Sequence, residues 1–255
     1  MVSGWFKDEY TGFGAEWLEH DERYVRSEEF IRVLQGMWTQ DRFSFDGKYY
    51  QIKDVPMEPK PLTKPHPTIF QGGNSAAARE MAARVSDVLF MNGGSVEHIA
   101  GLIQDVKQRA ERYGRADKIR FAMNSFVISR DTEEEAVKVL RAIVGQANVE
   151  AVKGFGEAVK EAGQSSPEGT GMWSNSTFED LVQYNDGFKP GLIGTPEQIA
   201  TRIQEYEAVG VDIILTGFLN FIQEVEDFGW SVYPLVRSLP SLRPEQQPTT
   251  VSVVK

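Results

Sequence analysis

Residues 68–75 read Thr-Ile-Phe-Gln-Gly-Gly-Asn-Ser, which is an apolar run followed by two glycines and a polar pair. The β-branched and aromatic residues of 68–71 predict a strand, and Ser75 is a typical N-cap for the helix predicted over 75–85. A second strand is predicted directly afterwards, over 87–91. The order strand, helix, strand indicates a parallel α/β fold.

The same alternation continues along the chain. Helices over 96–113 and 195–210 are each followed by a strand candidate, over 119–129 and 211–216. The second of these helices begins with Thr-Pro-Glu-Gln, a capping box with proline in its first turn. In a barrel, the active site lies at the carboxyl ends of the strands, where glycines and small polar residues follow these segments. Four strands, however, cannot close an eight-stranded barrel.

Other segments depart from this alternation. Asp46-Gly47 between aromatic runs predicts a β-hairpin, because a type I′ turn needs a positive φ at both central residues. The irregular stretch over about 162–191 is predicted to be a lid-like insertion. We expect a barrel domain over 1–239 and a flexible C-terminal tail over 240–255.

The composition limits the possible classes of function. The chain has 255 residues, 41% of them apolar, with a formal net charge of −10 and no cysteine. Acidic charge disfavours a nucleic-acid groove, and the lack of cysteine excludes disulfides, thiolate catalysis and Cys-ligated metals. No apolar run approaches the roughly 18 residues of a membrane span, and no signal-peptide pattern opens the chain. We therefore expect a cytoplasmic protein without nucleic-acid or membrane partners.

The turn at Gly73, Asn74 and Ser75 offers backbone N–H groups and a hydroxyl at a helix N-terminus, which suits a phosphate group. Glycine lets the backbone approach an anion closely. An ordinary strand-to-helix turn capped by Asn or Ser explains the same residues. Upstream, residues 20–24 read His-Asp-Glu-Arg-Tyr and precede a helix predicted to start at Ser27. They place an imidazole and a phenol near the same end of the predicted fold.

These motifs, in this order and spacing, resemble those of the bacterial-luciferase-like flavin monooxygenases, in particular the branch that acts on alkanesulfonates, methanesulfonate and dimethyl sulfone. The matching segments are residues 20–30, 46–48, 65–75, 193–197 and 209–212. The resemblance implies a (β/α)₈ TIM barrel of the luciferase-like type. Residues 2–4 would then end the fourth strand, so the chain is expected to lack the first three strands and most of the fourth.

The resemblance also implies a cofactor and its contacts. Reduced FMN is expected as a cosubstrate, supplied by a separate NAD(P)H-dependent flavin reductase. Tyr24 matches the family tyrosine whose hydroxyl reaches the flavin phosphate, His20 matches a histidine that often lines this pocket, and Ser3 matches a position beside the flavin. The turn over 73–75 would hold the phosphate. Alternatively, Tyr24 fills the core and His20 caps a loop.

The substrate pocket implied by the resemblance is less cationic than that of the sulfonate-cleaving relatives. Those relatives commonly place an Arg and a His on the seventh strand and an aromatic residue after the eighth. This chain has Asn124, Phe126 and Phe218 at the corresponding positions, with Asn220 nearby. Such residues suit a small, neutral polar molecule better than a sulfonate anion, which favours dimethyl sulfone. Packing in the hydrophobic core explains both phenylalanines equally well.

Other candidate residues have simpler explanations. His66 lies between two prolines and His98 falls on a helix surface, so we interpret both as structural, and no spacing of His, Asp and Glu predicts a metal site. Lys189 and Asn185 fall on the predicted lid, where a cation that closes on the flavin phosphate would exclude water. A solvated loop lysine is the alternative.

The expected function is that of an FMNH2-dependent monooxygenase, which uses O2 to oxidise a small organosulfur compound, dimethyl sulfone or an alkanesulfonate, with C–S cleavage. No residue stands out as a general base. Two alternatives remain open: an F420-dependent oxidoreductase of the same superfamily, or a truncated, non-catalytic remnant. The unpaired edges of an incomplete sheet favour association, so we expect a homo-oligomer.

Overall fold

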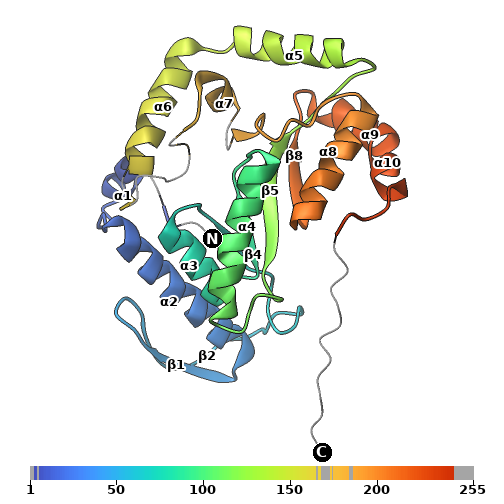
Figure 1. Ribbon diagram of the computed structural model, residues 1–255. Coiled ribbons are helices and arrows are strands. Elements are labelled where there is room, and N and C mark those ends of the chain that lie inside the picture. Colours follow the sequence, from blue (N-terminus) through green and yellow to red (C-terminus); the bar gives the residue numbers. More distant parts are fainter. Residues whose placement is uncertain are drawn as a thin grey trace, which may run out of the picture.

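A four-stranded parallel sheet lies at the centre of the protein in the computed structural model (Figure 1). The structure describes residues 3–4, 6–164, 166–167, 173, 175–183 and 186–243. In spatial order the strands are β3 (Phe70–Gly72), β4 (Val88–Met91), β5 (Arg120–Phe126) and β8 (Ile213–Gly217). They correspond to the four strands predicted from the sequence, and their parallel pairing confirms the predicted α/β class.

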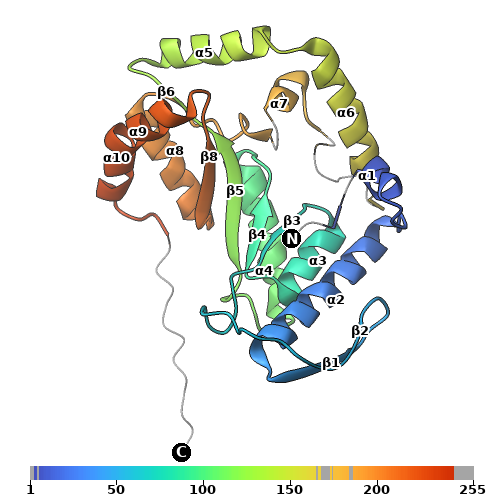
Figure 2. The ribbon, with the colours of Figure 1, turned by 180° about the vertical axis from the view of Figure 1, so that it is seen from behind.

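Three helices cover one face of this sheet. They are α3 (Ala76–Val85), α4 (Val96–Glu111) and α8 (Pro196–Val209). Of these, α4 lies in front of the strands in Figure 1 and behind them in Figure 2. Leu89 and Met91 of β4 and Phe121 and Met123 of β5 form a buried cluster with these helices. Because successive side chains of a strand point to opposite faces, this cluster fixes which residues lie on the other face.

We call that other face of the sheet the inner face; it carries Phe90, Ala122, Asn124, Phe126 and Leu215. Leu215 is 56% exposed, and Asn124 is its partner in the β5–β8 register. The edges of the sheet are β3 and β8, so the described strands form an open sheet. The prediction that four strands do not close a barrel is therefore confirmed.

The N-terminal part of the chain packs beside α3. Two helices, α1 (Lys7–Gly12) and α2 (His20–Thr39), are followed by the antiparallel hairpin of β1 (Arg42–Asp46) and β2 (Gln51–Pro56), as predicted. The predicted type I′ turn was wrong, because Asp46 pairs with Gln51, residues 47–50 form the loop, and neither Asp46 nor Gly47 has a positive φ. The Glu29 carboxylate holds this longer loop by accepting from the N–H groups of residues 48 and 49. The prediction that the second helix starts at Ser27 was wrong, because it starts at His20. Ser27 is buried inside α2. The acidic residues Asp21 and Glu22 stabilise the earlier start, since they lie in the first turn of the helix.

The predicted strand over 119–129 is two strands, β5 and the short β6 (Ile128–Ser129), because the pairing partner changes between them. β6 pairs with β7 (Ile193–Gly194) rather than with β8. Between these partners the chain forms α5 (Glu133–Gly145), α6 (Val149–Gln164) and α7 (Phe178–Val182). In Figure 1, α5 and α6 form an arm that arches away from the sheet. The predicted insertion over 162–191 therefore begins in the last turn of α6 and ends before β7.

The C-terminal helices α9 (Phe221–Ser231) and α10 (Tyr233–Ser238) follow β8. Residues 240–243 of the predicted tail contact the main body: the Arg243 guanidinium pairs with Asp212 at 2.9 Å, and Gln204 donates to the Pro240 carbonyl. Residues 244–255 lie outside the described part of the chain. Among the described helices, none is long and apolar enough to cross a membrane.

Candidate cofactor and substrate site

The turn between β3 and α3 is built around Gly73. Its φ of +128° is a conformation that favours glycine, and a Cβ at this position would lie 2.9 Å from both the Tyr24 hydroxyl and the Ala78 Cβ. Because Gly73 has no side chain, the backbone of the turn and the Tyr24 hydroxyl lie closer together than they could with any other residue at position 73. The tyrosine ring packs against the cluster of Ile31, Ile69, Met81 and Val85. Tyr24 is thus a packing residue whose hydroxyl lies at the turn.

The two residues after Gly73 place further polar atoms at the N-terminus of α3. The Ser75 hydroxyl accepts a hydrogen bond from the Ala78 N–H at 3.3 Å and so acts as the N-cap. The Asn74 Oδ1 is buried and has no hydrogen-bond partner among the described residues. The predicted N-cap role of Ser75 is confirmed.

The start of α2 brings the other predicted residues near Tyr24. The His20 ring lies 5.2 Å from the Tyr24 ring, and its Nδ1 is 2.6 Å from the Asp21 carboxylate. Ser3 is buried, and its carbonyl accepts a hydrogen bond from the Tyr10 hydroxyl at 2.8 Å. Arg23 donates to the Gly4 carbonyl at 2.6 Å, which fixes the segment of Ser3 on α2. Burial lowers the pKa of the Arg23 guanidinium.

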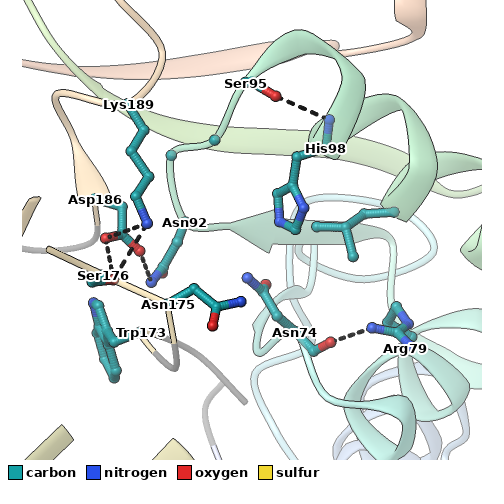
Figure 3. A pocket seen from close by; sticks show the side chains of 13 residues that line it. Asn74, Arg79, Asn92, Ser95, His98, Trp173, Asn175, Ser176, Asp186 and Lys189 are labelled. Atoms are coloured by element: carbon teal, nitrogen blue, oxygen red, sulfur yellow. Dashed lines mark hydrogen bonds and ion pairs between the residues drawn. The ribbon is translucent and has the colours of Figure 1, made fainter. Parts of the chain in front are cut away.

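A polar pocket of about 590 Å³ opens beside this turn (Figure 3). It lies between the N-termini of α3 and α4 and is covered by residues of the predicted insertion. In Figure 3 the amides of Asn74, Asn92 and Asn175 gather in its centre, between Lys189 and Arg79. The lining residues are Asn74, Arg79, Asn92, Gly93, Gly94, Ser95, His98, Leu102, Trp173, Asn175, Ser176, Asp186 and Lys189.

The charged side chains of this pocket are held by neighbours. Lys189 Nζ lies 3.1 Å from Asp186 and 3.6 Å from Asp180. Arg79 pairs with Asp105 at 2.6 Å and also donates to the Asn74 carbonyl. Both cations are thus paired with carboxylates, and the feature of the pocket that favours an anionic group is its position at two helix N-termini.

His98 lines the same pocket, although its place on a helix surface predicts a structural residue. It is exposed on α4, as predicted, but its ring faces the cavity (Figure 3). Burial of part of the ring, and then the charge of Lys189, lower the pKa of His98. The sequence does contain a signal for this side of the pocket: the pair Gly93-Gly94 before a helix repeats the pattern of the turn at 72–75.

The insertion is fixed to the end of β4 by Asp186. Its carboxylate accepts hydrogen bonds from the Ser176 hydroxyl at 2.6 Å and from the Asn92 amide at 3.4 Å. A Cβ at Gly93 would overlap the Asp186 carbonyl oxygen. The insertion therefore covers the carboxyl ends of the strands, where the sequence predicts a lid. Asn185, named with Lys189 as a lid residue, lies outside the described residues.

The four predicted substrate residues are not gathered in one place. Asn124 lies on the inner face of β5. The Phe126 ring, 8% exposed, packs edge-on against Phe188 at 5.3 Å, whereas the Phe218 ring packs against Phe228 at 5.7 Å in a separate apolar cluster. Asn220 is exposed before α9, and its backbone N–H donates to Glu224 at 3.1 Å.

No group of three or more His, Asp or Glu side chains in the described part of the chain is placed to hold a metal ion. His66 contacts the ring of Trp38 at 6.1 Å between centroids, and its Nδ1 lies 2.9 Å from the Pro67 carbonyl oxygen.

Comparison with known proteins places these features in context. A family model described as luciferase-like monooxygenase matches residues 1–213. An FMNH2-dependent dimethylsulfone monooxygenase of Pseudomonas putida is 60% identical over 243 residues, which is 95% of this chain and 66% of that protein. The protein of the same name from Pseudomonas fluorescens (strain Pf0-1) is 58% identical over 94% of this chain and 65% of its own length. This chain thus spans just under two thirds of the length of these relatives.

Solved structures share the fold. The riboflavin lyase RcaE, crystallised with modified FMN and riboflavin, matches with a TM-score of 0.77 at 18% identity, over 92% of this chain and 61% of that one. At such low identity the likeness concerns the fold alone, which is an α/β fold of the luciferase-like type.

Proposed function

The chain belongs to the luciferase-like monooxygenase family, and we propose that it functions as an FMNH2-dependent monooxygenase that oxidises dimethyl sulfone with C–S cleavage. The observation that carries this proposal is the 60% identity, over 95% of this chain, with a monooxygenase named for that cofactor and substrate. The activity is a proposal because the chain spans only 66% of that relative.

The residues present fit FMN. The Tyr24 hydroxyl, the N–H groups of Gly73 and Asn74 and the Ser75 hydroxyl suit the phosphate, with the positive ends of α3 and α4 beside them. The unpartnered Asn74 Oδ1 suits a hydroxyl donor such as those of the ribityl chain. We propose these residues, with His20 and Ser3 behind them, as the cofactor site.

When bound, reduced FMN supplies the electrons that activate O2 for transfer of one oxygen atom to the substrate. The protein positions the two partners and excludes water. Asp186 fixes the insertion over the ends of the strands, with its carbonyl packed where Gly93 leaves room. Of the predicted substrate residues, Asn124 would donate a hydrogen bond to the substrate, and Phe126 would form an apolar wall next to it. Phe218 and Asn220 would support the end of β8.

We also propose the predicted partners: O2, a separate NAD(P)H-dependent flavin reductase, and further copies of the chain. The two open edges of the sheet support association, as does the exposed apolar surface of α9, where Phe221 is 65%, Ile222 85% and Trp230 78% exposed.

The proposal is tested by turnover. The purified chain is supplied with reduced FMN and dimethyl sulfone, and the methyl resonance of dimethyl sulfone is followed by NMR with and without O2. We expect loss of dimethyl sulfone only when O2 and reduced FMN are both present. A folded chain that binds reduced FMN but leaves the sulfone intact would contradict the proposed substrate. Binding of F420 in place of FMN would support the F420-dependent alternative.

A further inference from the structure

Tyr206 on α8 joins two segments that lie far apart in the sequence. Its side chain is 0% exposed and belongs to the buried cluster beneath α3, α4 and α8. The hydroxyl oxygen lies 2.8 Å from the Gly94 carbonyl oxygen and 3.1 Å from the Pro190 carbonyl oxygen. A phenol has one proton to donate, so the two carbonyls share it in a three-centre hydrogen bond. Tyr206 therefore links the turn before α4 to the end of the insertion.

Packing alone does not explain this hydroxyl, because phenylalanine would fill the same space in the cluster. Burying an O–H group is unfavourable unless the group is hydrogen-bonded, and the two carbonyls meet that need. Burial also raises the pKa of Tyr206 to about 12, so the phenol keeps its proton and remains a donor at neutral pH. What the hydroxyl adds to the fold is thus a hydrogen bond to two loops.

Residues 186–190, which we call the stem of the insertion, pack on the turn that Tyr206 reaches. A Cβ at Gly93 would overlap the Asp186 carbonyl oxygen and would lie 2.8 Å from the Pro190 Cδ. Both ends of the stem therefore contact the same residue of the turn. The Tyr206 hydroxyl fixes this packing, because it binds one carbonyl of the turn and one of the stem.

The stem in turn holds polar groups of the pocket (Figure 3). Its Asp186 carboxylate accepts from the Ser176 hydroxyl at 2.6 Å, and its Lys189 Nζ lies 3.1 Å from that carboxylate. All three residues line the pocket. Tyr206 has no exposed surface, so it acts on the pocket only through the backbone that it binds.

The bond to Gly94 also orients a backbone donor. The peptide between Gly94 and Ser95 is trans, since the cis bonds of the described chain precede prolines. The carbonyl and the N–H of a trans peptide point in opposite directions, so a Gly94 carbonyl turned toward the buried Tyr206 directs the Ser95 N–H away from the core. Ser95 is exposed and lines the pocket, and the first N–H groups of a helix have no partner within it. The hydroxyl thereby fixes one donor at the edge of the pocket.

We propose that Tyr206 is a positioning residue for the monooxygenase reaction, whose hydroxyl keeps the stem closed on the turn before α4. This inference rests on the proposed function and adds to it a residue that touches neither flavin nor substrate. A closed stem excludes water, so that one oxygen atom of O2 passes to the sulfone. In an opened pocket the two electrons of reduced FMN, with two protons, reduce O2 to H2O2 instead, and the sulfone stays intact.

The first test is amide hydrogen exchange of the full chain without flavin, followed by NMR, which reports on the stem directly. Tyr206→Phe removes the hydroxyl and keeps the ring. The N–H groups of Lys189 and Gly191 donate to carbonyls within the stem and serve as its reporters. We expect both to exchange about fivefold faster in Tyr206→Phe, the effect of one lost hydrogen bond, with exchange in α2 as in wild type.

The matched control is Tyr113→Phe. The Tyr113 hydroxyl donates to Glu80 beyond the far end of α4, so its loss should leave the exchange of the stem unchanged.

The second test is the ratio of H2O2 formed to dimethyl sulfone consumed during turnover with reduced FMN. We expect this ratio to rise about fivefold in Tyr206→Phe and to stay at the wild-type value in Tyr113→Phe. The Kd of FMN should stay within about twofold of wild type, because the residues proposed for its phosphate lie at the other turn. A purely structural tyrosine would lower the thermal midpoint without moving the ratio.

The outcomes separate this inference from the proposed function. Unchanged exchange of the stem in folded Tyr206→Phe would overturn the inference, and so would faster exchange with an unchanged ratio. If Tyr206→Phe does not fold, wild type decides: the stem should exchange as slowly as α8, and exchange as fast as that of α7 would overturn the inference. Wild type that forms only H2O2 would contradict the proposed function, whereas a stem that opens in Tyr206→Phe, with faster H2O2 release, would still support closure by Tyr206.

Discussion

The turns that lead into α3 and α4 share a sequence pattern but differ in what packs on them. Each has two glycines after a strand and a serine N-cap whose hydroxyl accepts from the third helical N–H at 3.3 Å. At Gly73 the approaching group is the Tyr24 hydroxyl, and at Gly93 it is the Asp186 carbonyl. Glycine thus indicates a close approach in both turns, but the approaching partner comes from a distant part of the chain. One turn faces a hydroxyl donor and the other fixes the insertion.

The largest effect is expected from Gly73→Ala, because it combines a left-handed φ with two close contacts. The substitution should lower the free energy of unfolding by about 3 kcal/mol and weaken FMN binding. Chemical denaturation and flavin fluorescence measure the two effects. The matched control is Gly114→Ala, since Gly114 also has a positive φ, +62°, but open space around it. Equal losses in the two variants would mean that Tyr24 does not restrict the turn.

Gly93→Ala isolates the contact with the insertion, because Gly93 is not among the residues with positive φ. Overlap with the Asp186 carbonyl should cost about 2 kcal/mol and loosen the insertion. Hydrogen exchange should therefore quicken in α7 more than in α2. Gly101→Ala in α4, with no atom within 4 Å of its Cβ position, should not loosen α7. Unchanged exchange in α7 would mean that Gly93 does not hold the insertion.

Tyr24→Phe tests the hydroxyl at the first turn without changing its packing. We expect the Kd of FMN to rise about tenfold, which corresponds to about 1.4 kcal/mol, while the midpoint of thermal unfolding stays near that of wild type. Tyr233→Phe on exposed α10 is the control and should change neither quantity. A large loss of stability with unaltered FMN affinity would assign Tyr24 to packing alone.

The smallest effect concerns His98, beside the second turn. Its pKa is lowered in the folded protein, chiefly by burial, so the folded state binds fewer protons than the unfolded chain. Stability should be fully present above pH 6.5 and should fall as the pH drops through the pKa of the folded state. His98→Gln should show a shallower fall in unfolding free energy over this range. An identical pH profile in both proteins would mean that His98 does not cause the fall in stability at low pH.

Local patterns predicted the fold well where short-range physics decides the structure. The four strands and the capping box at Thr195 followed from alternation and N-cap preference, whereas the hairpin after α2 was predicted with the wrong turn. The helix start at His20 was missed because Ser27 is also a good N-cap. Burial of Ser27 within α2 is a tertiary effect that propensity does not contain.

The site was predictable only in part. The turn over 73–75 and Tyr24 have a sequence signature, and the structure brings them into contact. Phe126 and Phe218 lie close to their strands' ends, but their rings pack in different clusters, which a linear pattern does not reveal.

The most direct test of the account compares binding of reduced FMN and reduced riboflavin under anaerobic conditions. The two flavins differ only by the phosphate, which the account places at Tyr24 and the turn over 73–75. Saturable binding of FMN, with riboflavin about a hundredfold weaker in wild type and a smaller difference in Tyr24→Phe, is the predicted result. Equal affinity for the two flavins, or no binding of FMN by a well-folded chain, would contradict the phosphate site.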